Sequence, residues 1–288
     1  MSHHDYILTL SCPDKTGIVY AVSGFLFEHQ CNIIDSAQFG DDGTALFFMR
    51  VHFDAPSALS HEALQAAFAA IGERFEMRWQ IHDARRRARV LIMVSKIGHC
   101  LNDLMFRAKS GTLPIDIPAV VSNHPDFALL SASHAVPFYH LPLAAGASEE
   151  DKARQEQQVL DIIERERIDL VVLARYMQIL SPNLCAKLKG RAINIHHSFL
   201  PSFKGGRPYH QAHERGVKLI GATAHYVTGD LDEGPILEQD VARTDHAMDP
   251  DELTALGRDV ECVVLARAVK WHVEHRILLN GRKTVVFK

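Results

Sequence analysis

Two runs of consecutive apolar residues constrain the fold of this chain most strongly. Residues 90–94 read VLIMV and residues 170–174 read LVVLA, with no polar side chain in either run. Strands buried on both faces of a sheet have this composition, whereas a strand with one face in water alternates apolar and polar residues. Stretches with helical character follow both runs, and such alternation predicts a Rossmann-like α/β domain with a mostly parallel, doubly wound sheet.

The remaining segments after residue 86 fit the same alternation. Ser148 precedes an acidic stretch as a plausible N-cap, and Ser181-Pro182 and Asp249-Pro250 place a proline at the first position of a helix. These signals and the apolar spacing predict strands at 119–121, 138–141, 192–196 and 222–227, and helices at 100–109, 148–167, from 181, at 209–215 and at 251–275.

The first 82 residues have a different pattern. Strand candidates lie at 6–10, 31–34, 45–51 and 75–81, and helix candidates begin at 18 and 59. Asp41-Asp42-Gly43 marks a hairpin turn between the second and third strands. The order βαββαβ predicts a ferredoxin-like α/β unit. The pattern lapses at residues 83–88, so we expect two domains, residues 1–85 and residues 86–288.

Composition narrows the class of protein. The 288 residues carry a net charge of −4, so no chain-wide basic signal indicates nucleic-acid binding. The Arg-rich run at 85–89 is better explained as a solvated linker than as a nucleic-acid patch. Five scattered cysteines without a CxxC pair argue against a disulfide framework or zinc ribbon. With no signal-peptide pattern and no long apolar run, we expect a cytoplasmic protein without membrane contact.

Residues 193–240 hold the candidate chemistry. Asn194 and His196 alternate on one face of a predicted strand, at the end where open α/β sheets bind ligands. His225 lies on a later strand and Asp232 in a loop that Gly234-Pro235 closes. Each residue alone is more simply a structural histidine or a turn aspartate. Together, an amide, imidazoles and a carboxylate suit the transfer or hydrolysis of a carbonyl-derived group.

The order of these motifs resembles the superfamily of formyltetrahydrofolate-using hydrolases and transferases. The matching residues are Asn194-Ile195-His196, Leu200-Pro201, His225-Tyr226-Val227 and Leu231-Asp232-Glu233-Gly234-Pro235-Ile236. The resemblance covers about residues 88–285. It implies that Asn194, His196 and Asp232 are catalytic, with His225 in support. It also implies a folate pocket around residues 174–180, and we expect substrate contacts from Met177, Gln178, Ile179, Leu180, Gly229 and Asp230.

The N-terminal unit is similar to an ACT domain, through residues 12–19 and Asn32-Ile33. ACT domains bind small regulatory ligands, so the resemblance implies an amino-acid effector such as glycine or methionine. The alternative is a packing or oligomerisation domain without a ligand, since a fold alone does not establish function. Because ACT sheets commonly pair edge to edge, we expect a homo-oligomer.

An ACT domain joined to a formyl-folate catalytic domain resembles the formyltetrahydrofolate deformylase family. The resemblance implies hydrolysis of 10-formyltetrahydrofolate to formate and tetrahydrofolate, which supplies formate for purine synthesis and balances the folate pools. The alternative is a formyltransferase acting on an amine such as glycinamide ribonucleotide. Residues 95–99 contain one glycine where a phosphate cradle would stand, which favours water as the acceptor.

Two further expectations concern ligands. A third hypothesis is a sensor that binds folate or an amino acid without catalysis, although a protein that only binds gains little from Asn194, His196 and Asp232. His196 and His197 are neighbours on a strand and point to opposite faces, so we expect no metal site. No cofactor is expected either, because folate is the substrate.

Overall fold

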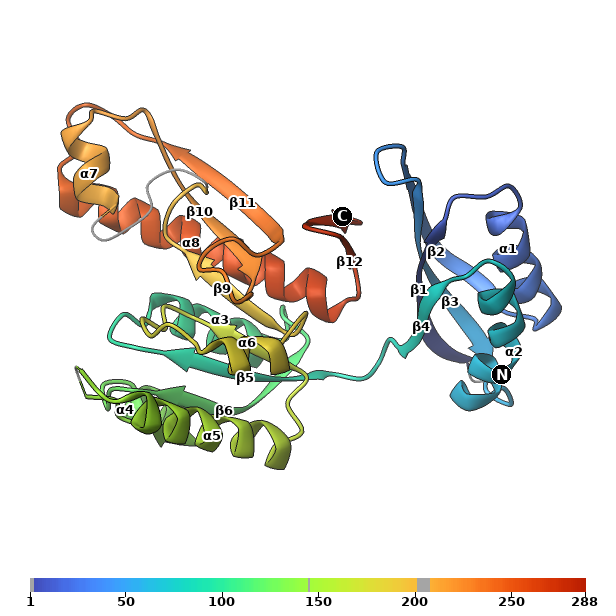
Figure 1. Ribbon diagram of the computed structural model, residues 1–288, viewed down its shortest axis with the longest axis horizontal. Coiled ribbons are helices and arrows are strands. Elements are labelled where there is room, and N and C mark those ends of the chain that lie inside the picture. The colour runs from blue at the N-terminus through green and yellow to red at the C-terminus, as the bar shows by residue number, and fades with distance from the viewer. Residues whose placement is uncertain (1–2, 145, 201–207) are drawn as a thin grey trace. The chain divides into compact units, whose positions relative to one another are not determined.

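The computed structural model describes residues 3–144, 146–200 and 208–288, and it divides into two compact units (Figure 1). Unit 1 comprises the first 86 residues and residues 274–288, and unit 2 comprises residues 87–273. The sequence predicts that all of residues 86–288 belong to the second domain, whereas residues 274–288 group with unit 1. Among the described residues, no helix is long and apolar enough to cross a membrane.

Unit 1 has the expected βαββαβ order. Its elements are β1 (His3–Pro13), α1 (Ile18–Glu28), β2 (Asn32–Asp41), β3 (Leu46–Pro56), α2 (His61–Arg74) and β4 (Arg78–Asp83). The strands form an antiparallel sheet in the order β2-β3-β1-β4. Alternate sheet residues such as Leu8, Val51 and Phe53 pack against Phe25 and Phe68 of the helices and form the core. The last strand begins at residue 78 rather than 75, because Phe75 ends α2 as a buried C-cap.

The C-terminal hairpin, residues 274–288, explains the unexpected grouping. It contains β12 (Ile277–Asn280) and β13 (Lys283–Val286), which the sequence analysis did not predict. Buried Arg50 of β3 donates from Nε and Nη2 to the carbonyl oxygen of Glu274, at 3.3 and 3.1 Å. The rings of His82 and His275 stack with centroids 3.5 Å apart. These contacts join the hairpin to the ferredoxin-like sheet.

Unit 2 contains a seven-stranded sheet in the order β11-β10-β9-β8-β5-β6-β7. The strands are β5 (Ala88–Val94), β6 (Ile115–Ser122), β7 (Phe138–His140), β8 (Leu170–Leu173), β9 (Ala192–His196), β10 (Leu219–Tyr226) and β11 (Ile236–Arg243). Neighbours from β7 to β9 are parallel, and β10 is antiparallel to both β9 and β11. The mostly parallel α/β sheet is therefore confirmed. Strand β11 was not predicted.

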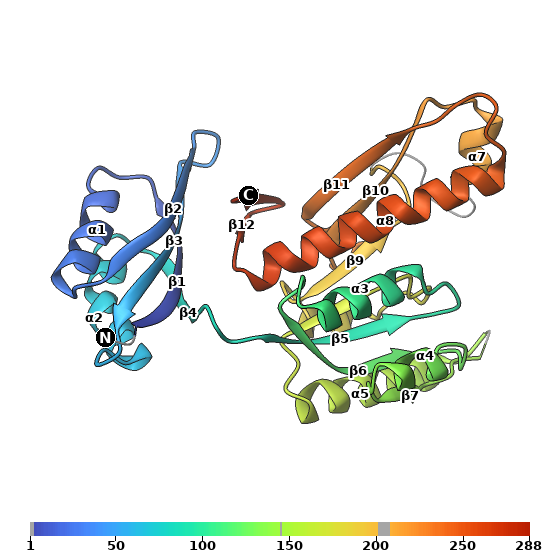
Figure 2. The same ribbon diagram turned by 180° about the vertical axis from the view of Figure 1, so that it is seen from behind.

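Helices cover both faces of this sheet. They are α3 (His99–Ser110), α4 (Ala128–Ser133), α5 (Glu149–Arg165), α6 (Pro182–Lys187), α7 (Pro208–Glu214) and α8 (Pro250–Val273). Residues of α5 and α6 share one apolar core with β5, β6 and β8. Helices α3 and α8 lie side by side over the other face (Figure 2). Ser148 caps α5 in a capping box with Asp151, and Ser181 caps α6, as predicted.

Candidate functional site

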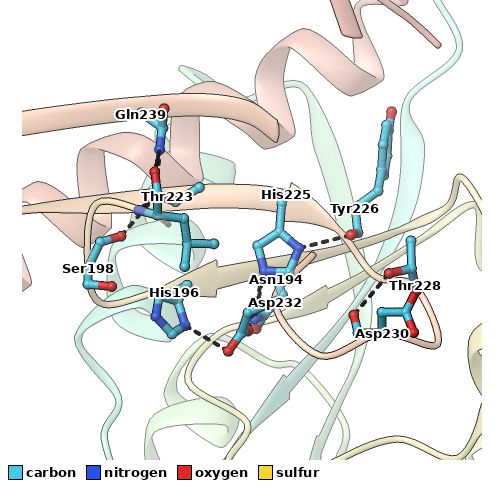
Figure 3. Close-up of polar contacts among 11 residues, drawn as sticks. Asn194, His196, Ser198, Thr223, His225, Tyr226, Thr228, Asp230, Asp232 and Gln239 are labelled. Carbon is cyan, nitrogen blue, oxygen red and sulfur yellow. Dashed lines mark hydrogen bonds and ion pairs between the residues drawn. The ribbon is translucent and has the colours of Figure 1, made fainter. Parts of the chain in front are cut away.

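Antiparallel pairing between β9 and β10 brings three of the candidate residues together. The register places His225 directly opposite Asn194, and Thr223 opposite His196. Because strand side chains alternate, His225, Asn194 and His196 all project from the same face of the sheet (Figure 3). The Nδ2 atom of Asn194 lies 3.3 Å from Nε2 of His225. Residues 31 positions apart in sequence are thus adjacent in the site.

Asp232 completes this arrangement from the loop after β10. Its Oδ2 lies 3.3 Å from Nδ1 of His196, and its Oδ1 lies 3.6 Å from Nε2 of His225. The backbone of Asp232 has a φ of 57°, in the left-handed region that non-glycine residues seldom adopt. Gly234 permits this turn, because a Cβ there would lie 1.7 Å from the carbonyl oxygen of Tyr226. The Leu-Asp-x-Gly-Pro motif therefore places a carboxylate between two imidazoles.

Hydrogen-bond partners assign the protons in this cluster. A carboxylate only accepts, so Nδ1 of His196 carries the hydrogen that faces Asp232. Nδ1 of His225 lies 2.9 Å from the carbonyl oxygen of Tyr226 and donates to it. With Nδ1 as the donor, Nε2 of His225 accepts from Asn194, whose second N–H remains available to a ligand.

The two histidines control the charge of the carboxylate. The hydrogen bond from His196, together with the neighbouring imidazole of His225, holds the pKa of Asp232 well below its ordinary value and outweighs the opposing effect of partial burial. Asp232 is therefore an anion at neutral pH. Its contact with Nδ1 of His196 fixes the orientation of that imidazole, which also lines the cavity.

A cavity of about 260 Å³ opens beside the cluster. Asn194, His196, His225 and Asp232 are among the residues that line it. The six expected substrate contacts also line it, namely Met177, Gln178, Ile179, Leu180, Gly229 and Asp230. Met177 and Ile179 are more than half exposed, although they are apolar. Exposed apolar side chains beside a cavity are typical of a small-molecule binding site.

The cavity also has lining residues that the sequence analysis did not select. Arg175 and Tyr176 lie within the predicted folate segment 174–180 but were not among the six expected contacts, and His197 follows His196. Arg175 is 9% exposed and has a φ of 65°. Burial, the charge of Arg175 and His196 lower the pKa of His197 to about 4. Arg175 stood inside the recognised segment, but its burial depends on partners distant in sequence.

Hydrogen bonds to β10 and β11 hold the loop after β9 in place. The Thr223 hydroxyl donates to the carbonyl oxygen of Ser198 at 2.9 Å and accepts from the amide of Leu200 at 3.0 Å. Gln239 of β11 donates to the same hydroxyl at 2.9 Å. These bonds position the residues that directly follow His196. Pro201 of the expected Leu-Pro motif and the Gly-rich segment at 204–207 lie outside the described residues.

Two family models of known proteins match this chain. Residues 88–269 match the family model of formyl transferases, and residues 4–82 match that of ACT domains. The chain is thus a formyl transferase-fold protein with an N-terminal ACT domain.

Relatives narrow this class. A formyltetrahydrofolate deformylase from Corynebacterium sp. (strain P-1) is 49% identical, over 98% of either chain. The crystal structure of such a deformylase from Burkholderia mallei ATCC 23344 is 57% identical, with a TM-score of 0.93, over 99% of this chain and 100% of that one. Glycinamide ribonucleotide transformylase 1 from Symbiobacterium toebii is 26% identical, with a TM-score of 0.65, over 70% and 95% of the two chains. The chain belongs to the formyltetrahydrofolate deformylase family.

Proposed function

We propose that this chain hydrolyses 10-formyltetrahydrofolate to formate and tetrahydrofolate. Asn194, His196 and Asp232 are the proposed catalytic residues, and His225 supports them. The observation that carries the proposal is the position of one carboxylate, 3.3 Å from His196 and 3.6 Å from His225, in the lining of a cavity that exposed apolar side chains also line. Formate released in this way supplies reactions that consume one-carbon units, including purine synthesis.

Asn194 is the proposed oxyanion donor. Water attacks the formyl carbon, and the carbonyl oxygen gains negative charge. One N–H of the Asn194 amide is directed to His225, so the other is held in a fixed orientation toward the cavity. A preorganised donor of this kind typically lowers the barrier by about 2.7–4 kcal/mol.

His196 and Asp232 divide the proton chemistry. A carboxylate with a lowered pKa is a weak base, so Asp232 is better suited to orient water and to stabilise protonated His196 than to take a proton. Within the described part of the chain, Nε2 of His196 is buried and has no hydrogen-bond partner. Protonated His196 thus keeps one N–H for the substrate, either for the oxyanion or for the folate nitrogen as it leaves.

The test is formate release from 10-formyltetrahydrofolate without any amine acceptor. Purified full-length chain should release formate and tetrahydrofolate in equal amounts. A strict requirement for an amine would reject hydrolysis in favour of formyl transfer. Binding of the folate without turnover would instead indicate a sensor.

The ACT domain is proposed to bind an amino-acid effector. Glycine or methionine is expected to shift the rate of formate release by the full-length chain. A chain without the first 85 residues that responds equally would argue against the ACT domain as the receptor. Unchanged activity with every amino acid would leave packing as the role of this unit.

A homo-oligomer is proposed from the surface of unit 1. Strand β2 is an edge strand, and its apolar residues Ile33, Ile34 and Phe39 are 39%, 52% and 47% exposed. An exposed edge with apolar side chains is a site for pairing with another chain. Light scattering should give a multiple of the chain mass, and charged replacements at Ile34 and Phe39 should lower it. A monomeric wild-type chain would contradict the proposal.

A further inference from the structure

The stretch of chain between β8 and α6 lines the cavity, although it has no regular secondary structure. Residues 174–180 belong to neither a helix nor a strand. Residues 174–176 are buried, whereas Met177 and Ile179 are 59% and 63% exposed. Exposed side chains have few packing contacts to fix them, so the shape of this part of the cavity depends on how the backbone of the stretch is held.

Ser95 holds the first end of this stretch. It lies directly after β5 and is 3% exposed. Its amide donates to the carbonyl oxygen of Arg175 at 3.2 Å, and its hydroxyl accepts from the amide of Met177 at 2.9 Å. The backbone of Arg175 is in the left-handed region, so the chain turns sharply where Ser95 holds it. Ser95 therefore fixes the residue at which the stretch changes from buried to exposed.

Asn123 fixes the hydroxyl of Ser95 in turn. Asn123 follows β6 and is 5% exposed, and its Oδ1 accepts from that hydroxyl at 2.7 Å. A hydroxyl has one hydrogen, which goes to Asn123, and it keeps its lone pairs for the N–H of Met177. The bonded residues follow the carboxyl ends of β6, β5 and β8, which are neighbours in the sheet. One hydroxyl thus ties the cavity lining to the strand ends.

A second buried side chain holds the far end of the stretch. Glu156 of α5 is 6% exposed, and its Oε1 accepts from the amide of Ser181 at 2.7 Å. Its Oε2 accepts from the hydroxyl of Ser181, which is the N-cap of α6. Residues 177–180 lie between these two held points, and they all line the cavity. The shape of this short bridge is therefore set by its ends.

Ser95 and Asn123 stand behind the cavity lining. Neither of them is among the described residues that line the cavity. The proposed catalytic residues belong to β9 and to the loop after β10, whereas the hydroxyl of Ser95 bonds to Met177 and Asn123. Ser95 can therefore act on a bound folate only through the backbone of the lining stretch. Its effect on binding is separable from the proton chemistry.

We propose that Ser95 is a positioning residue for the folate: its hydroxyl holds the backbone of Met177, so that residues 177–180 have the shape for binding before the substrate arrives. The inference rests on the proposed function, because it takes this stretch as the folate contact. The apparent affinity of a site falls with the fraction of molecules whose site has the binding shape. Without the hydroxyl, the N–H of Met177 turns to another acceptor, and that fraction decreases.

The test is Ser95→Ala in the full-length chain. The change removes only the hydroxyl, so the amide of Met177 and Oδ1 of Asn123 lose this partner. We expect KM for 10-formyltetrahydrofolate to rise about tenfold, the size of effect that one buried polar group without its partner produces. The kcat should stay within about twofold of wild type, because a change in KM alone marks a loss of binding rather than of chemistry. Calorimetric titration with tetrahydrofolate should show the same loss of affinity.

Ser148→Ala is the matched control. The hydroxyl of Ser148 has the same bonding pattern, since it accepts from the amide of Asp151 at 3.1 Å and donates to Oδ2 of Asp151 at 2.8 Å. It caps α5 and is not among the described lining residues of the cavity. Its loss should lower the melting temperature and leave KM unchanged. An equal rise in KM would show that general destabilisation weakens binding, and would overturn the proposal.

Asn123→Ala tests whether the two side chains act as one unit. It should raise KM less than Ser95→Ala does, because Ser95 can still accept from Met177. In the double variant, KM should rise no further than in Ser95→Ala, since Asn123 acts through the hydroxyl that is already absent. A double variant in which the two increases multiply would contradict the proposed arrangement.

The remaining outcomes separate this inference from the proposed function. A folded Ser95→Ala with the KM of wild type would refute the inference and leave hydrolysis by wild type intact. If Ser95→Ala does not fold, hydrogen exchange of wild type decides: the amide of Met177 should exchange slowly although its side chain is exposed, and rapid exchange would refute the inference. If wild type neither binds tetrahydrofolate nor releases formate, the proposed function fails and the inference fails with it.

Discussion

Replacing Asp232 by Asn isolates the charge of the carboxylate that is proposed to be catalytic. The amide keeps the shape of the side chain, and its oxygen can still accept from Nδ1 of His196. At the observed 3.3 Å and an effective dielectric constant of about 20, full charges on the two groups attract by about 5 kcal/mol. At about 1.36 kcal/mol per decade, this is an upper limit of nearly four decades in rate. Because desolvation reduces the net value, we expect turnover to fall by roughly 10²–10⁴-fold.

The assay is acceptor-free formate release, with thermal unfolding to verify the fold. Asp240→Asn is the matched control, since Asp240 pairs with Arg267 on the surface at 2.9 Å and lies outside the cavity. The pKa of Asp232 is lowered in the folded chain, so its carboxylate stabilises the fold at pH values above 3.8, its ordinary pKa. That contribution should be lost as the pH falls below 3.8. A folded Asp232→Asn with near-normal turnover would refute the assigned role.

Three other changes test the surrounding structure. Gly234→Ala should lower both turnover and melting temperature, because the new Cβ would meet the carbonyl oxygen of Tyr226 at 1.7 Å; unchanged values would mean that the Asp232 turn tolerates a side chain. Burial and neighbouring positive groups lower the pKa of His197 to about 4, so the unfolded chain binds this proton more readily than the folded chain. The free energy of unfolding of the wild type should therefore decrease as the pH falls from 6.5 to 4, and His197→Gln should make this decrease smaller. Equal pH profiles of unfolding would contradict this. Removal of the C-terminal hairpin should destabilise unit 1 by about 1–3 kcal/mol in calorimetry, because Arg50 loses its hydrogen bonds to the carbonyl oxygen of Glu274 and keeps Asp35 as a partner. An unchanged transition of unit 1 would argue against that contact.

Local patterns in the sequence were sufficient for most secondary structure. The run at 90–94 became a strand within β5, and Ser148 and Ser181 became helix caps, because these features depend on neighbours within a few residues. Strand β11 was missed, since Glu238, Gln239 and Asp240 interrupt its apolar pattern. It forms nevertheless, because the antiparallel register with β10 satisfies its backbone. The C-terminal hairpin was also missed. Its contacts are with Arg50 and His82, which are distant in sequence.

The two fold classes, the order of the candidate motifs and the shared face of Asn194 and His196 could all be predicted from the sequence. These follow from side-chain periodicity and from short motifs whose parts act locally. The tertiary structure alone decided that His225 faces Asn194, that Asp232 lies between two imidazoles, and that Glu261 meets Arg175 and His99. Burial and pKa depend on groups that are distant in the chain, so they follow only from the packed sheet and its helices.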